Sequence, residues 1–167
     1  MLKAVIFDLD GVLVDSTPLH LEAMRLFIES FGKVYNKPQG GREGMRIIDI
    51  IAEYKDIYGL SGNLDELYAK RQKIFLEMVK TKIQLFPGAL ELLEKLKQRK
   101  LILVLATSGS RDYVNILFSM FSELGKAFSI VVTGDDVLRG KPYPDIYKKA
   151  VEALGLKPGV AVVIEDS

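Results

Sequence analysis

The chain of 167 residues has no cysteine, one histidine and a formal net charge of only +1. Without cysteine it can have neither a disulfide framework nor thiolate chemistry. Its 23 basic side chains nearly balance its 22 acidic ones, so the charge gives no support to a nucleic acid or a membrane surface as partner. No stretch approaches the roughly 18 apolar residues of a membrane span, and the first apolar run is interrupted at Asp8, too early for a signal peptide. We therefore expect a cytoplasmic protein that binds neither membrane nor nucleic acid.

Low-complexity and repeated segments are also missing from the sequence, and a hydrophobic content of 49% indicates a folded protein. A chain of this length can form one core, or a core with a small accessory domain.

Residues 17–80 carry no strand signal. Thr17 and Pro18 predict a helix start, with the threonine hydroxyl as N-cap and the proline in the first turn. Two more amphipathic stretches follow a polar loop, one from Met45 to Tyr54 and one from Asn63 to Val79. This block predicts a small all-helical domain.

The remainder of the chain alternates between helical segments and short apolar runs that predict buried strands. The four runs are residues 3–7, 101–106, 128–132 and 160–164. Between them we expect, among others, one continuous helix from about Asp112 to Leu124 and one that Gly155 ends. The alternation predicts a doubly wound parallel α/β sheet with right-handed crossovers.

The helical block is therefore an insertion into an α/β core. The core would comprise residues 1–15 and 84–167, and the helical cap domain residues 16–83. The two connections, near Asp15 and near Phe86, would act as hinges.

Two aspartates, Asp8 and Asp10, stand at the carboxyl end of the first predicted strand, the edge at which open α/β sheets bind ligands. On an extended backbone, side chains two residues apart point the same way. Gly11 then lets the chain turn sharply away. One carboxylate of such a pair can attack phosphorus while the other transfers protons, and their charge calls for a divalent cation. The alternative is that two acidic residues merely end a surface strand.

Four segments in order resemble the motifs of the haloacid dehalogenase (HAD) superfamily. Asp8-Leu9-Asp10-Gly11-Val12-Leu13-Val14-Asp15-Ser16 is similar to the first motif of its small-metabolite phosphatases and β-phosphoglucomutase-like enzymes. Ala106-Thr107-Ser108-Gly109 resembles the second motif, Gly140-Lys141-Pro142 the third, and Glu165-Asp166-Ser167 the fourth. A strand-end threonine or a loop lysine is ordinary by itself, but four motifs in order are far more specific.

The resemblance implies a role for each motif. Asp8 would be the nucleophile and Asp10 the general acid and base. Thr107 would bind phosphate, together with Ser108 and Gly109 of the following loop. Lys141 would neutralise the charge that gathers during phosphoryl transfer.

The resemblance also implies a Mg²⁺ site between the first and the last strand. Its ligands would be the Asp8 side chain, the Asp10 backbone carbonyl and Asp166, with Glu165 a weaker candidate. Hard oxygen donors of this kind suit Mg²⁺.

Three residues of the predicted cap are candidates for substrate contact. His20 lies in the first turns of the cap helix, near the cleft. A histidine matches this position in β-phosphoglucomutase, but Pro-Leu-His also occurs in plain phosphatases of the branch, and a histidine on the helix surface is the alternative. Arg42 and Arg46 could reach a distal substrate group from the cap loop, or be ordinary exposed arginines.

The function we expect is Mg²⁺-dependent hydrolysis of small phosphate esters, with sugar phosphates the favoured class, through an aspartyl-phosphate. One alternative is a phosphosugar isomerase similar to β-phosphoglucomutase. Dehalogenation is disfavoured because that chemistry needs no metal. A further alternative is an inactive or incomplete HAD protein with a binding role.

In the family the chain continues beyond the fourth motif, whereas this sequence stops at Ser167. We therefore expect the last strand to lack a covering helix and to expose an apolar face. An uncovered apolar face favours self-association.

Overall fold

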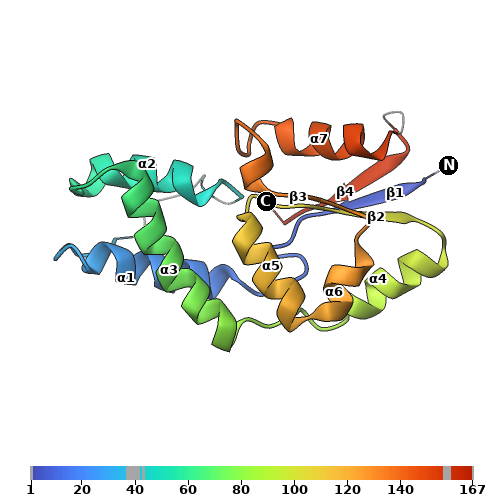
Figure 1. The fold of residues 1–167 in the computed structure, drawn as a ribbon, viewed down its shortest axis with the longest axis horizontal. Coiled ribbons are helices and arrows are strands. Elements are labelled where there is room, and N and C mark those ends of the chain that lie inside the picture. The colour runs from blue at the N-terminus through green and yellow to red at the C-terminus, as the bar shows by residue number, and fades with distance from the viewer. Residues whose placement is uncertain (1, 37–41, 43, 156–158, 167) are drawn as a thin grey trace.

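The computed structural model describes residues 2–36, 42, 44–155 and 159–166. Its centre is a four-stranded parallel sheet in the order β3-β2-β1-β4 (Figure 1). The strands are β1 (Ala4–Phe7), β2 (Ile102–Ala106), β3 (Ile130–Val132) and β4 (Ala161–Ile164). All three pairings are parallel, so the predicted doubly wound α/β fold is confirmed. Because β1 and β2 lie in the middle, the first and second motifs emerge side by side from the centre of the sheet.

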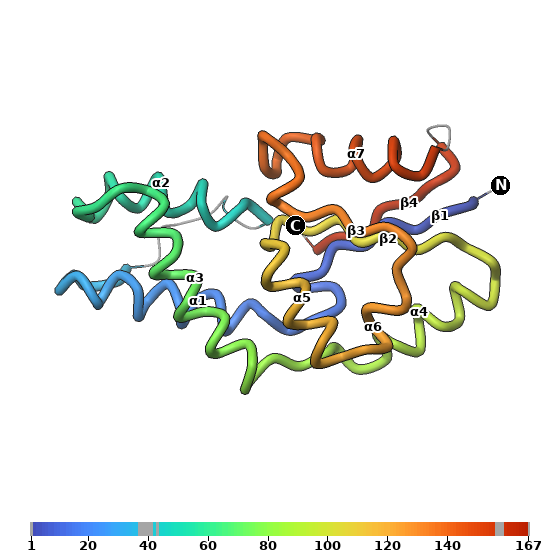
Figure 2. The backbone as a smooth tube through the Cα atoms, viewed as in Figure 1, coloured from blue at the N-terminus to red at the C-terminus, as the bar shows by residue number. Residues whose placement is uncertain are grey.

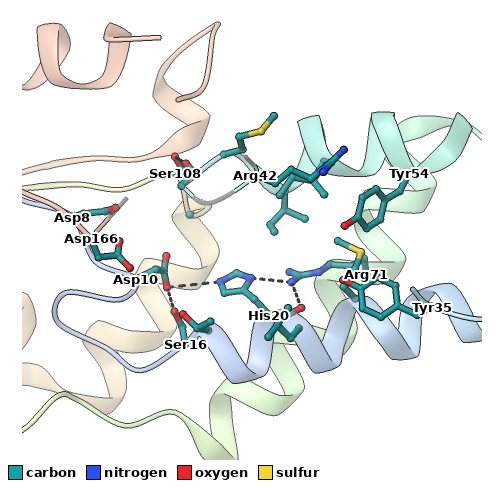
Figure 3. Close-up of a pocket in the computed structure, with 18 residues that line it drawn as sticks. Asp8, Asp10, Ser16, His20, Tyr35, Arg42, Tyr54, Arg71, Ser108 and Asp166 are labelled. Atoms are coloured by element: carbon teal, nitrogen blue, oxygen red, sulfur yellow. Dashed lines mark hydrogen bonds and ion pairs between the residues drawn. The ribbon is translucent and has the colours of Figure 1, made fainter. Parts of the chain in front are cut away.

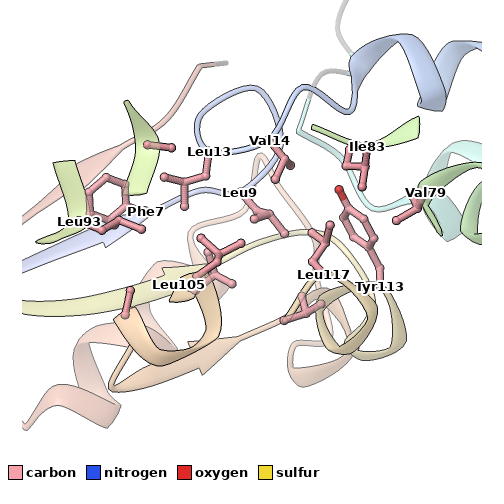
Figure 4. Close-up of a cluster of buried hydrophobic side chains, with 14 of the residues drawn as sticks. Phe7, Leu9, Leu13, Val14, Val79, Ile83, Leu93, Leu105, Tyr113 and Leu117 are labelled. Atoms are coloured by element: carbon pink, nitrogen blue, oxygen red, sulfur yellow. The ribbon is translucent and has the colours of Figure 1, made fainter. Parts of the chain in front are cut away.

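Helices cover both faces of the sheet (Figure 1). On one face lies α7 (Asp145–Leu154), and on the other lie α4 (Ala89–Gln98), α5 (Arg111–Met120) and α6 (Ser122–Ala127). Along the two central strands, successive side chains point to opposite faces of the sheet and so pack against different helical layers. Phe7 and Leu105 pack in the cluster drawn in Figure 4, whereas Ile6 and Val104 pack with Ile146 and Ala150 of α7.

The single helix expected from Asp112 to Leu124 is wrong. The chain forms α5 and α6 instead, and Phe121 between them leaves the helical conformation with φ −123° and ψ 77°. After this break, Leu124 and Ala127 are buried in the same cluster as Leu117 of α5. Burial of both apolar groups against the sheet has therefore overridden the continuous helical pattern.

The three predicted cap helices are present as α1 (Thr17–Glu29), α2 (Ile47–Tyr58) and α3 (Leu64–Lys82). They form an apolar cluster of their own, which includes Phe27, Ile51 and Leu67. Asn63 caps α3 in a capping box with Glu66. The N-cap of α1, however, is Ser16 and not the expected Thr17. The Ser16 hydroxyl makes no capping bond because it donates to Asp10.

The two connections between core and cap run side by side. The Asp15 N–H donates to the Gln84 carbonyl, and the Phe86 N–H donates to the Leu13 carbonyl, each at 2.9 Å. Val14 and Leu85 form an antiparallel bridge between these bonds. The domain boundaries at residues 15/16 and 83/84 stay a prediction, but the chain crosses between core and cap at this paired segment.

The base of the cap is packed onto the core. Phe75 and Val79 of α3 belong to the same buried cluster as Leu9, Leu13 and Val14 of the first motif. Figure 4 labels Val79 and the three first-motif residues. The cap therefore has an apolar contact with the loop that carries Asp8 and Asp10, in addition to its covalent connections.

The outer strand β4 exposes apolar side chains, since Val162 is 43% and Val163 40% exposed. Self-association through this edge stays a prediction. Among the helices that the structure describes, none combines the length and apolar character needed to cross a membrane.

We predict that Leu105→Ala lowers the free energy of unfolding by about 2–5 kcal/mol, because the side chain is fully buried in the central strand. Leu92→Ala is the matched control. Leu92 is 43% exposed on α4, so its loss should change the free energy by only about 0.5 kcal/mol. Urea unfolding followed by circular dichroism measures both, and equal effects of the two changes would contradict the described packing.

Candidate active site

The first motif forms a tight turn at the end of β1. The Asp8 N–H donates to the carbonyl of Ile164 at 2.9 Å, so β1 and β4 stay paired up to this residue. The N–H groups of Leu13 and Val14 both donate to the Leu9 carbonyl and close the turn. The carboxylates of Asp8 and Asp10 consequently line the same pocket.

Gly11 is required in this turn for two reasons. Its φ of +75° lies in the left-handed region that favours glycine. A Cβ built on it would also lie 1.9 Å from Oδ2 of Asp166. The missing side chain thus admits the carboxylate of the fourth motif against the first-motif loop.

Asp8 and Lys141 form a buried ion pair. The Lys141 Nζ donates to Asp8 Oδ2 at 2.6 Å and to Glu165 Oε1 at 2.5 Å, while Asp8 Oδ1 accepts from the Leu9 N–H at 2.8 Å. Asp8 and Lys141 are 4% and 6% exposed. This arrangement fixes both oxygens of Asp8 and engages Glu165, the weaker of the expected metal ligands, with the lysine.

Burial and the mutual attraction of the two charges act against each other in this pair. Burial raises the pKa of Asp8 to about 6, against the lowering effect of the Lys141 charge and hydrogen bond. Burial also acts to lower the pKa of Lys141, but the charge of Asp8 and the bonds to Asp8 and Glu165 hold it above its ordinary value. Lys141 therefore stays positively charged.

Asp10 is surrounded by hydrogen-bond donors (Figure 3). Its Oδ1 accepts from the Ser16 hydroxyl at 2.5 Å and from the Tyr113 hydroxyl at 2.8 Å, and His20 Nε2 lies 3.8 Å away. Burial acts to raise the pKa of Asp10, but the interactions with His20, Ser16 and Tyr113 outweigh it and lower the pKa. The site therefore favours the carboxylate form of Asp10.

His20 bridges Asp10 and a buried arginine. Its Nδ1 lies 2.9 Å from Nη2 of Arg71. A guanidinium only donates, so Nδ1 accepts and the ring proton is on Nε2, which faces Asp10. Burial lowers the pKa of His20, and the charge of Arg71 adds to this, so the ring is neutral. The ring also stacks on Phe75 at a centroid distance of 4.1 Å.

Arg71 is a cation without solvent contact. It is 0% exposed, its Nε has no hydrogen-bond partner, and burial lowers its pKa to about 10. The second bond of its Nη2 goes to the backbone carbonyl of His20, at 3.2 Å. The guanidinium therefore fixes both the ring and the backbone of His20.

The pocket that these residues line has a volume of about 210 Å³ (Figure 3). Its core end is formed by Asp8, Asp10, Asp166, Ser108 and Gly109. Its cap end is lined by apolar, aromatic and basic side chains that include Met24, Ile50, Tyr35, Tyr54, Arg42 and Arg71. An acidic end in the core thus faces a mostly apolar end in the cap.

Several predicted site residues lie beside the pocket and do not line it. Thr107 is fully buried at the end of β2, where its Oγ1 accepts from the Gly109 N–H at 3.0 Å. Lys141 is bonded to Asp8, which lines the pocket, and Glu165 is bonded in turn to Lys141. The Ser108 hydroxyl, which does face the pocket, donates to the Gly44 carbonyl of the cap at 2.5 Å.

The two arginines predicted to reach a substrate lie in different surroundings. Arg42 lines the pocket, where its Nε donates to Glu53 at 2.8 Å and its guanidinium lies over the ring of Tyr54. Arg46 does not line this pocket, so a contact between Arg46 and a substrate stays a prediction. It pairs with Asp49 and donates to the carbonyl of Val137 in the core.

Ser16, Tyr113 and Arg71 were not predicted as site residues. Ser16 ends the first motif, and its role depends on the turn that brings it back to Asp10. Tyr113 comes from α5, and no local pattern relates it to Asp10. For Arg71 the sequence does contain a signal, because it stands in the buried row Leu67, Arg71, Phe75 and Val79, at intervals of four residues along α3. A charge in such a row indicates a buried polar contact.

Within the described part of the chain, no three His, Cys, Asp or Glu side chains gather closely enough to form a metal cluster. The acidic end of the pocket does combine the carboxylates of Asp8, Asp10 and Asp166.

Comparisons with known proteins agree with this geometry. The family model for haloacid dehalogenase-like hydrolases matches residues 2–167. The phosphorylated carbohydrates phosphatase of Thermotoga maritima is 38% identical over 99% of this chain and 77% of its own length. The validoxylamine A 7'-phosphate phosphatase of Streptomyces hygroscopicus subsp. limoneus is 31% identical over 100% of this chain and 78% of its own length.

Among solved structures, CbbY from Rhodobacter sphaeroides in complex with phosphate superposes with a TM-score of 0.83 at 26% identity, over 100% of this chain and 79% of that one. The predicted branch and enzyme class, phosphoric monoester hydrolase, are thereby confirmed. The acidic pocket at the carboxyl edge of the sheet, the helical insertion and these similarities together establish that the chain belongs to the haloacid dehalogenase-like hydrolase family.

Proposed function

We propose that the chain is a Mg²⁺-dependent phosphatase that hydrolyses phosphate esters of small carbohydrates through an aspartyl-phosphate. The observation that carries the proposal is the buried pair of Asp8 and Lys141, in which Asp8 lines a pocket that Asp10 also lines. The similarity to a phosphatase of phosphorylated carbohydrates supports the substrate class.

Asp8 is the nucleophile in this proposal. A pKa of about 6 leaves it mostly ionised at neutral pH, and the bonds from Leu9 and Lys141 fix its orientation. One carboxylate oxygen forms the new bond to phosphorus while the bond from phosphorus to the ester oxygen breaks. The positive charge of Lys141 offsets the negative charge that accumulates when the Asp8 carboxylate approaches the phosphoryl group.

Asp10 is the general acid and base of the proposed reaction. It gives a proton to the departing ester oxygen, and it later takes one from the water that cleaves the aspartyl-phosphate. The donors Ser16 and Tyr113 hold it in the basic form that the second step needs. A phosphate dianion arriving beside it raises its pKa, which favours the protonated form that the first step needs.

The loop after β2 would bind the phosphate oxygens. The Thr107 hydroxyl accepts from the Gly109 N–H and keeps its own proton for donation. A Cβ on Gly109 would lie 2.8 Å from the ring of Tyr113 and 3.2 Å from Thr107 Oγ1. A glycine at this position therefore lets the loop stay close to both residues.

Asp8, Asp166 and the backbone carbonyl of Asp10 would hold Mg²⁺. These are the hard oxygen donors that the ion prefers, and Gly11 makes room for the Asp166 carboxylate. Glu165 is a weaker candidate because its Oε1 accepts from Lys141. When bound, the ion would offset the charge of the transferring phosphoryl group.

The cap end of the pocket would select the rest of the substrate. Arg42 and Tyr54 offer polar contacts there, while Met24 and Ile50 provide apolar walls. A volume of about 210 Å³ suits a small phosphorylated metabolite, and the cap would exclude bulk water from the reaction.

A phosphosugar isomerase is the second candidate. It would use the same core but return the phosphoryl group to a sugar instead of water. The observation that favours it is His20, whose Nε2–H faces Asp10 from the cap and so ties cap position to the acid–base group.

We predict different losses from the two aspartates. Asp8→Asn should abolish the phosphoenzyme, because an amide cannot attack phosphorus. Asp10→Asn should slow turnover by about 10²–10⁴-fold, the usual cost of losing a general acid–base group, and leave binding of a metal-fluoride phosphate mimic largely intact. Turnover with Mg²⁺, acid-trapped phosphoenzyme and mimic affinity measure these effects. Asp65→Asn, an exposed change on α3, is the control, and wild-type turnover by Asp8→Asn would exclude the covalent mechanism.

A second prediction separates the two candidate functions. Given β-glucose 1-phosphate, a sugar bisphosphate primer and Mg²⁺, the chain should release inorganic phosphate faster than it forms glucose 6-phosphate. Phosphate assay and coupled detection of glucose 6-phosphate measure both products in one reaction. Mainly isomerised sugar phosphate would reverse the ranking and assign the core chemistry to a mutase.

A further inference from the structure

Arg46, at the N-terminal end of α2, crosses from the cap to the core. Its Nη1 donates to the Val137 carbonyl at 3.0 Å. Val137 lies in the loop that joins the 3₁₀ helix η1 (Gly134–Asp136) to the third motif. Figure 1 shows this end of α2 facing the loop that leads to α7, and the trace in Figure 2 shows the same arrangement.

Arg46 is held in place by its neighbour Asp49. Two parallel bonds, from Nε at 2.8 Å and from Nη2 at 2.9 Å, connect the guanidinium to the two carboxylate oxygens. Bidentate pairs of this kind fix the plane of the guanidinium. The third nitrogen, Nη1, is thereby aimed at the core loop.

The core loop is shaped to receive this pair. A Cβ on Gly140 would lie 2.8 Å from Cγ and Nε of Arg46 and 2.8 Å from Oδ2 of Asp49. The φ of Gly140 is not in the left-handed region, so the glycine is needed for space. A Cβ on Gly134 would lie 2.4 Å from the carbonyl oxygen of Ser108 in the core and, at ordinary contact distance, 3.4 Å from Cδ of Arg46. Two glycines of one core loop thus face the same cap side chain.

Gly140 directly precedes Lys141, whose ammonium holds Asp8. A displacement of Gly140 therefore passes through a single peptide bond to the lysine. A second bond from cap to core lies nearby, where the Ser108 hydroxyl donates to the Gly44 carbonyl two residues before Arg46.

We propose that Arg46 and Asp49 form a clasp by which the docked cap positions the loop of Lys141, so that Lys141 is set against Asp8 only when the cap is closed. Arg46 is then a positioning residue and makes no contact with the substrate. The proposal rests on the proposed function for its kinetic consequence, and on the described contacts alone for its structural one.

The test compares Arg46→Ala, Gly140→Ala and the double variant in the full chain. Arg46→Ala removes the bond to Val137, and Gly140→Ala places a methyl group in the clasp. Each should lower kcat by about 10–100-fold with a smaller change in KM, since a misplacement of the order of 1 Å at the reacting groups can cost about 10²-fold. When the Arg46 side chain is already removed, the methyl group added at position 140 has fewer atoms to displace. The kcat of the double variant should therefore be scarcely lower than that of either single variant.

Arg25→Ala is the matched control. Arg25 also makes a bidentate bond to an acidic neighbour on a cap helix, through Nε and Nη2 to Glu22, but its side chain is 42% exposed and both of its acidic partners, Glu22 and Glu29, lie on α1. Its kcat should stay within about twofold of the wild type.

Hydrogen exchange gives a readout that is independent of catalysis. In Arg46→Ala the amides of the non-proline residues between 137 and 145 should exchange faster, including Tyr143, whose N–H donates to the Gly140 carbonyl, while β1 and β2 stay protected. Faster exchange there in a chain without phosphatase activity would uphold the clasp and reject the proposed function. Wild-type exchange of residues 137–145, an increase spread evenly over the chain, or fully additive losses in the double variant would overturn the clasp.

Discussion

The structure depends on one buried ion pair formed between residues 133 positions apart, Asp8 and Lys141. Such a pair is costly to desolvate, and removing one partner typically destabilises a protein by about 3–5 kcal/mol. The surrounding structure must therefore hold both side chains in position. Parallel pairing of β1 with β4 fixes Asp8, and Glu165, directly after β4, gives the ammonium its second acceptor. The place of β4 beside β1 thus supports the ion pair as well as the burial of apolar side chains.

The cap also contains a fully buried charged side chain, Arg71. A cation with no exposed surface is tolerated because its donors reach the ring and carbonyl of His20, and because its guanidinium lies over the ring of Phe75 at 4.7 Å. The result is a continuous polar path from the cap interior to Asp10. The acidic end of the pocket lies in the core and the mostly apolar end in the cap, and this path connects them.

Much of the fold and part of the site could be predicted from the sequence, for local reasons. An apolar run that ends in Asp8 and Asp10 marks a strand and the edge of a sheet at once, and the same holds for Thr107 and Asp166. Contacts set by packing could not be predicted. The break at Phe121 arises from burial of Leu124, and the bond of Arg46 goes to a core loop 91 residues away. No periodicity within a helix contains that information.

The paired connections between core and cap have a mechanical consequence. Two separate tethers would let the cap slide and twist, whereas strands joined by the bonds of Asp15 to Gln84 and of Phe86 to Leu13 move as one ribbon. A ribbon bends readily across its flat face and resists shear in its own plane. Opening should then follow a swing about one axis, with Ser16 and His20, only a few residues beyond the ribbon, travelling through a short arc.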